Sequence, residues 1–187
     1  MMTFDPSARS MTNGETVMAS AWIEAPPQRI FRALVGKEVE QWWGSADTYR
    51  MVDWSAELHV GGCWTVVVRT ADGRDLPAGG EFLEIEAPRR IVQTRRYGWD
   101  HPKLGRRQTT VAYLLEPTAG GTLLTICHGG FAGLADAAAE HAEGWGRVLC
   151  WLQDYFTKRR PGDPHPAGTC RLPASSGISR LVGTASI

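Results

Sequence analysis

The chain has 187 residues and a hydrophobic content of 43%, enough for one globular domain with its own core. Its formal net charge is +0 at pH 7, so neither a basic field for a nucleic-acid partner nor an acidic excess for a basic partner is present. No apolar run is long enough to cross a bilayer, and the segment 1–20 lacks the apolar core of a signal peptide. We therefore expect a cytoplasmic protein without membrane insertion.

The first part of the chain predicts one strand followed by two short helices. The segment 1–14 is polar and is expected to be a flexible N-terminal tail. Residues 15–24 alternate imperfectly between apolar and polar side chains, which indicates a strand. Apolar residues at helical spacing predict a short helix over 27–36 that ends at a glycine, and a second short helix over 37–43 follows.

The middle of the chain is rich in strand-like segments separated by glycine, proline and Asp-Gly turn signals. Several alternate apolar and polar residues, as a strand with one buried face does. The expected strands are 49–60, 63–70, 81–86, 91–97, 107–116 and 122–128.

The strongest helical pattern lies in 131–160, where one apolar stripe recurs at helical spacing. The stripe consists of Trp145, Val148, Leu149, Leu152 and Phe156. We expect this helix to cover the apolar face of the preceding strands. The residues 161–187 are rich in Pro, Gly, Ser and Thr without periodicity and are expected to form a disordered C-terminal tail, so that the folded domain is 15–160.

This order of elements predicts the α+β class, with the helices segregated to one face of an antiparallel sheet. A strongly curved sheet wrapped around one long C-terminal helix leaves a cavity between them. The sequence leaves both a monomer and a homodimer open.

Several short motifs, in this order, resemble a known superfamily. They are Glu40-Gln41-Trp42-Trp43-Gly44, Gly61-Gly62-Cys63-Trp64, His128-Gly129-Gly130-Phe131 and Gly144-Trp145. Together they resemble the SRPBCC (START/Bet v 1-like) superfamily, in the branch named after the activator of heat-shock protein 90 ATPase homologues, over residues 15–158. The resemblance implies a helix-grip fold around a deep apolar cavity. Members bind lipids, polyketides and other hydrophobic molecules, and a few are cyclases, aromatases or hydrolases.

Two positions depart from the pattern of the superfamily. Glu57 and His59 stand where an Asp-x-Arg pattern commonly precedes the Gly-Gly hairpin, and Arg95 stands where relatives often carry tryptophan. Strand alternation puts Ile91, Gln93 and Arg95 on one face, which would bring a polar pair to the cavity. The alternative, slightly preferred because arginines are mostly exposed, has Arg95 pointing outward.

Eight tryptophans are many for this length, and they suit either an aromatic pocket or ordinary core packing. Trp99 is in a loop and is the best candidate for a gate. His128 shares its parity with inward-facing residues, and a hydrogen-bonded structural role is preferred over an acid–base role. The predicted ligand-binding residues are Trp42, Trp43, Trp54, Trp64, Gln93, Arg95, Tyr97, Trp99, Tyr113, His128, Phe131, Trp145 and Leu149.

The sequence contains no Cys-x-x-Cys pair, no His-Glu-x-x-His and no phosphate-binding glycine loop, so no metal and no cofactor are expected. The catalytic residues, if there are any, are unknown at this stage. The predicted function is binding of a small hydrophobic, aromatic or polyketide- or lipid-like ligand. Two alternatives remain: a cyclase-, aromatase- or hydrolase-type enzyme using the same cavity, and a co-chaperone-like module that stimulates a heat-shock protein ATPase.

Overall fold

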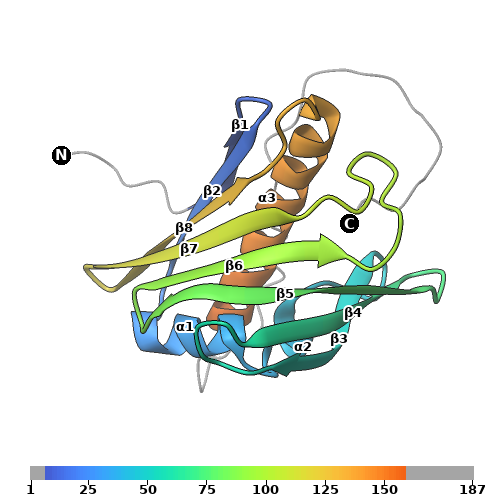
Figure 1. The fold of residues 1–187 in the computed structure, drawn as a ribbon. Helices are drawn as coiled ribbons and strands as arrows, with labels where there is room; N and C mark the ends of the chain where they lie inside the picture. Colours follow the sequence, from blue (N-terminus) through green and yellow to red (C-terminus); the bar gives the residue numbers. More distant parts are fainter. Residues whose placement is uncertain (1–6, 159–187) are drawn as a thin grey trace.

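An antiparallel sheet curves around one long helix, α3, in the computed structural model, which describes residues 7–158 (Figure 1). The sheet has 8 strands in the order β1-β2-β8-β7-β6-β5-β4-β3. The strands are β1 (Arg9–Thr12), β2 (Thr16–Ile23), β3 (Tyr49–Ala56), β4 (Cys63–Thr70), β5 (Asp75–Glu86), β6 (Arg90–Tyr97), β7 (Thr109–Thr118) and β8 (Gly121–Gly129). The helices are α1 (Pro27–Val35), α2 (Val39–Trp42) and α3 (Ala135–Lys158). The predicted α+β class and the helix-grip architecture are confirmed.

The core lies between the concave face of the sheet and α3. In β8, burial alternates along the strand, so that Leu124, Ile126 and His128 face inward. The stripe of α3 meets this face, and its residues Leu149 and Leu152 are fully buried. The helices α1 and α2 lie together at one end of the sheet (Figure 1). This arrangement encloses the space between α3 and the middle of the sheet.

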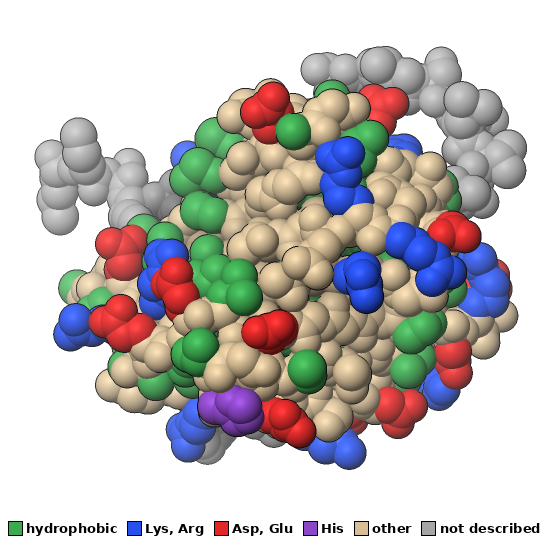
Figure 2. Space-filling view, viewed as in Figure 1, with side chains coloured by type: hydrophobic (Ala, Val, Ile, Leu, Met, Phe, Trp, Pro, Cys, Tyr) green, Lys and Arg blue, Asp and Glu red, His purple; other side chains and the backbone are tan. Residues whose placement is uncertain are grey.

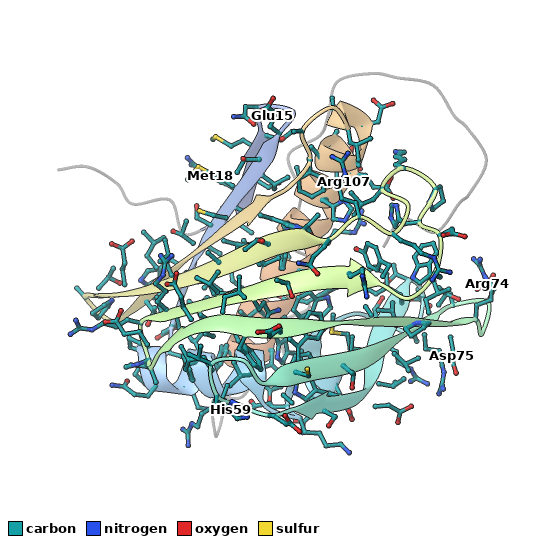
Figure 3. All side chains as sticks on the ribbon, in the orientation of Figure 1. Glu15, Met18, His59, Arg74, Asp75 and Arg107 are labelled. Carbon is teal, nitrogen blue, oxygen red and sulfur yellow. The ribbon has the colours of Figure 1, made fainter. Side chains whose placement is uncertain are left out.

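The outer surface carries mixed charges. Basic and acidic side chains are interspersed on the face shown in Figure 2. Arg74 and Asp75 lie at the tip of the hairpin between β4 and β5 (Figure 3). Each binds a neighbour of opposite charge, Arg74 to Asp72 at 2.8 Å and Asp75 to Arg69 at 2.7 Å. None of the helices within 7–158 has both the length and the apolarity that a membrane span requires.

The N-terminal segment differs from its prediction as a flexible tail. Residues 9–12 form β1, which pairs antiparallel with β2 at the edge of the sheet. The strand is mostly exposed and is held by backbone hydrogen bonds. Its sequence therefore lacks the alternation of apolar and polar residues from which a strand is predicted. The predicted C-terminal tail, 161–187, lies outside the described residues.

The strand β5 begins at Asp75, six residues before its predicted start at Glu81. Gly79 and Gly80 resemble a turn signal, because paired glycines usually mark a turn, but they lie inside this strand. A Cβ atom on Gly80 would stand 1.9 Å from the carbonyl oxygen of Thr94. Glycine is needed there because the two strands approach closely, not because the chain turns.

Candidate functional site

A small cavity lies between α3 and the concave face of the sheet. Its volume is about 30 Å³, which holds about one or two water molecules. Nine residues from β3, β6, β8, α3 and the segment after α2 line it: Trp43, Tyr49, Arg95, Tyr97, His128, His141, Gly144, Trp145 and Val148. The wall is therefore largely aromatic, with one cation and two imidazoles.

One face of α3 forms the helical side of this cavity. His141, Gly144, Trp145 and Val148 are at positions i, i+3, i+4 and i+7, which lie on one side of an α-helix. A Cβ atom on Gly144 would have no neighbouring atom within 4 Å, so this glycine borders open space. A glycine inside a helix lowers the stability of the helix by about 1 kcal/mol relative to alanine. At this position the missing side chain leaves room in the cavity.

Arg95 is the one charged residue of the cavity wall, and it points inward. Its side chain is on the same face of β6 as Tyr97, and the residue is only 6% exposed. The adjacent Arg96 is exposed. The prediction that Ile91, Gln93 and Arg95 share an inner face is therefore correct, and the preferred outward orientation of Arg95 is wrong. The register of β6 places Arg95 on the face toward the cavity, and this overrides the general tendency of arginines toward the surface.

The guanidinium of Arg95 is surrounded by aromatic rings. Its central carbon lies 5.9 Å from the ring centroid of Trp43 and 5.5 Å from that of Tyr97, within cation–π range. Within 7–158, no carboxylate forms a salt bridge with it. Burial alone would lower the pKa of Arg95, but the neighbouring tyrosines, Tyr97 foremost, outweigh this effect and hold it above its ordinary value. The group is therefore a protonated, buried cation.

The hydrogen bonds of His128 fix its tautomer. The indole N–H of Trp145 donates to His128 Nδ1 at 2.9 Å, so Nδ1 is the unprotonated acceptor. The other nitrogen, Nε2, then carries the proton and donates to Thr109 Oγ1 at 2.9 Å. The hydroxyl of Thr109 in turn donates to the carbonyl of Arg95 at 3.2 Å. Both nitrogens of His128 are thus occupied, as the predicted structural role requires.

His141 is likewise neutral, but it reaches a group of the cavity wall. Its Nδ1 lies 2.8 Å from the carbonyl oxygen of Ala137, which can only accept, so Nδ1 carries the proton. Its Nε2 therefore accepts the hydroxyl proton of Tyr97, at 3.1 Å. Burial is the main cause that lowers the pKa of His141 to about 4. Burial also lowers the pKa of His128 well below its ordinary value, and in both cases the charge of Arg95 adds to the effect.

A loop after β6 packs on the outer side of Tyr97. The ring of His101 stacks on Tyr97 with centroids 5.0 Å apart, and Trp99 contacts both rings at 5.5 and 5.2 Å. His101 lies in this loop but is buried, and its Nδ1 accepts hydrogen bonds from the backbone N–H groups of Lys103 and Leu104. The indole nitrogen of Trp99 is buried and has no hydrogen-bond partner within residues 7–158.

Three of the predicted site tryptophans serve as anchors of the scaffold. Trp42 and Trp54 donate their indole N–H groups to the carbonyls of Ala33 and Val35, at 3.0 and 3.1 Å. These carbonyls are in the last turn of α1, where no backbone donor remains for them. Trp64 donates to a carbonyl of β6 and stacks on Trp54 at 5.6 Å. None of the three is among the residues that line the cavity.

The other predicted site residues divide between the cavity wall and a layer around it. Trp43, Arg95, Tyr97, His128 and Trp145 line the cavity. The residues outside the wall are Gln93, buried on β6; Trp99, in the loop; Tyr113, against Trp145; Phe131, against His128 and His141; and Leu149, fully buried on α3. Tyr49, His141, Gly144 and Val148 line the cavity but were not among the predicted site residues. The i, i+3, i+4, i+7 spacing from His141 is the signal that would have found three of these four.

A curved antiparallel sheet around a C-terminal helix, with an aromatic-lined cavity between the two, defines a protein of the helix-grip class. The sequence matches the family model described as activator of Hsp90 ATPase homolog 1-like protein over residues 24–157, and the chain belongs to that family. Domains of this family typically have a hydrophobic cavity. No curated protein matches the sequence significantly.

Solved structures share the fold at low sequence identity. A crystal structure of a protein from Rhodobacter sphaeroides has a TM-score of 0.69 at 21% identity, covering 81% of this chain and 99% of that one. The AHSA1 protein from Silicibacter pomeroyi has a TM-score of 0.63 at 21% identity, covering 78% and 99%. CalU16 from Micromonospora echinospora has a TM-score of 0.52 at 17% identity, covering 83% and 87%. These likenesses establish the fold.

Proposed function

We propose that the protein binds a small hydrophobic, aromatic ligand between α3 and the concave face of the sheet. The observation that carries this proposal is the open space at Gly144, on the one face of α3 that meets an aromatic wall. Flat ligands stack well on indole and phenol rings, and Trp43, Trp145 and Tyr97 provide such faces. The family's typical hydrophobic cavity supports the same function.

Binding requires the cavity to enlarge, because about 30 Å³ is far below the several hundred Å³ of a typical ligand pocket. We propose that aromatic side chains move aside to make this room. Trp99 is the candidate gate, since it is only half-buried, belongs to a loop, and has an indole nitrogen without a partner. Its displacement would uncover the ring of Tyr97, against which it packs.

Filling the space at Gly144 is expected to block binding. The neutral fluorescent probe N-phenyl-1-naphthylamine should bind the wild-type protein and bind Gly144→Leu at least about tenfold more weakly, because the leucine side chain occupies the cavity. Ala139→Leu adds the same side chain to an exposed position of the same helix and should bind like wild type. Fluorescence titration of all three measures the effect. Absence of wild-type binding, or equal binding by Gly144→Leu, would refute the proposed cavity.

A second candidate function, proton transfer on a carbonyl substrate, is favoured by one specific observation. The hydroxyl of Tyr97 is hydrogen-bonded to the imidazole of His141 and adjoins the guanidinium of Arg95. Such a set would hold a carbonyl oxygen with Arg95 and move a proton through Tyr97. A ligand that is bound and recovered chemically unchanged after prolonged incubation would argue against this enzyme. The co-chaperone alternative stays a prediction from the sequence.

A further inference from the structure

We propose that the ligand of this cavity is an organic anion, a hydrophobic monocarboxylate whose carboxylate binds Arg95. This inference rests on the proposed binding function and specifies the chemical class of the ligand. It starts from the buried charge of Arg95, which sits on the cavity wall at the middle of the molecule. A buried charge needs a counterion or a full set of hydrogen-bond acceptors, and a cation without one is costly to keep.

The described part of the protein does not provide that counterion. The partners of the Arg95 guanidinium are the ring faces of Trp43 and Tyr97 and the phenol groups of nearby tyrosines. Burial raises the pKa of Tyr49 and Tyr113, so their hydroxyls stay neutral near pH 7 and add no negative charge.

Two acidic residues near the cavity pair with cations other than Arg95. Glu140, on α3, accepts a salt bridge from Lys103 at 2.8 Å and faces His101. Asp100, in the loop after β6, binds Arg106 at 2.7 Å. Neither acidic residue is among those that line the cavity. The cavity therefore keeps its positive charge, since His128 and His141 are neutral and neither can act as a counterion.

The geometry favours a carboxylate over a larger anion. One guanidinium offers two parallel N–H groups, which match the two oxygens of a carboxylate. A phosphate dianion would bring a second negative charge that no further cation among the cavity-lining residues could balance. The rest of the ligand would lie along Trp43 and Trp145 toward the open space at Gly144. A neutral ligand of the same shape would leave Arg95 as it is, buried without a counterion.

The test compares two ligands with the same ring system and nearly the same shape, one carrying a charged carboxylate and the other a neutral amide. Calorimetric titration at pH 7 should show 2-naphthoate binding at least about tenfold more tightly than 2-naphthamide, a difference of about 1.4 kcal/mol. In Arg95→Met the two affinities should become equal, chiefly through loss of naphthoate binding. Arg96→Met removes the neighbouring exposed arginine of the same strand and should keep the wild-type preference.

The possible results separate this inference from the proposed function. Equal affinities in the wild type, or a naphthoate preference that survives in Arg95→Met, would overturn the anion class and leave hydrophobic binding intact. Failure of both naphthalenes and of the neutral fluorescent probe would remove the binding function itself. Methionine keeps an unbranched apolar chain at the site, so Arg95→Met should melt no lower than wild type. Should that variant fail to fold, the ligand pair in the wild type still decides the question.

Discussion

Replacing Trp145 by alanine is expected to lower the free energy of unfolding by about 5 kcal/mol, close to the whole stability of a small domain. Trp145 is 4% exposed and packs on the rings of Trp43, Tyr113 and His128 at 5.5, 6.0 and 5.9 Å. Removal of this buried ring costs about 3–5 kcal/mol. The loss of the donor to His128 Nδ1 adds about 1–3 kcal/mol, and relaxation of the surrounding side chains into the space recovers part of the total. Urea unfolding followed by circular dichroism measures the loss.

Trp145→Phe separates the hydrogen bond from the packing. Phenylalanine keeps an aromatic ring at the position but has no N–H to donate to His128. We expect it to cost about 2 kcal/mol, between wild type and Trp145→Ala. The control is Trp22, a half-buried residue on the outer face of the sheet whose indole N–H donates to Thr118 in an exposed hydrogen bond; Trp22→Phe should cost about 1 kcal/mol or less. Wild-type stability of Trp145→Phe would show that His128 is not held as described.

Stability is expected to fall steeply as the pH drops below about 6. Burial lowers the pKa of His141 to about 4 and that of His128 well below its ordinary value of 6.5. Between these values the unfolded chain binds protons that the folded protein does not, so acid favours unfolding. The stabilising contribution is complete above pH 6.5 and is lost toward pH 4. Each of these two histidines contributes a slope of up to about 1.4 kcal/mol per pH unit, so together they give about 2.7, and His101, whose pKa burial also lowers, adds to this slope.

Chemical unfolding at pH 7, 6 and 5 measures this slope. His141→Gln should reduce it by about 1.4 kcal/mol per pH unit, because one of the three buried imidazoles among residues 7–158 no longer titrates in the unfolded state. His59→Gln should leave it unchanged, since the side chain of His59 is 67% exposed and lies outside the core. A wild-type stability that is constant from pH 7 to pH 5 would contradict the neutral, buried state of both histidines.

The fold was largely predictable because most of its elements carry a clear apolar period. The strand over 63–70 was predicted with the bounds that β4 has, and the stripe from Trp145 to Leu152 identified α3. The edge strand β1 lacks such a period and depends on pairing with β2, which a local pattern does not reveal. The start of β5 was hidden by Pro77 and the glycine pair at 79–80, which resemble turn signals.

The site was predicted less completely, for a physical reason. The composition showed that tryptophan is abundant, but it does not show which group accepts the hydrogen bond of each indole N–H. For Trp42 and Trp54 the acceptors are carbonyl oxygens of α1, which are distant in the sequence. The apolar pattern did not predict the cavity face of α3, because His141 is polar and Gly144 has no side chain, so neither adds to an apolar stripe. Strand alternation correctly predicted that Arg95 faces the cavity. The general preference of arginine for the surface predicted the opposite orientation, which is wrong.

Nitrogen-15 NMR of the indole and guanidinium groups during titration with 2-naphthoate would test most directly that this cavity binds a ligand through Arg95. Each tryptophan contributes one indole N–H signal, which reports on its own surroundings. The signals of Trp43, Trp145 and Arg95 Nε are expected to shift together in one saturable step, while that of Trp22, on the outside of the sheet, stays in place. Saturable shifts confined to residues outside the cavity, with Arg95 unchanged, would contradict the proposed site.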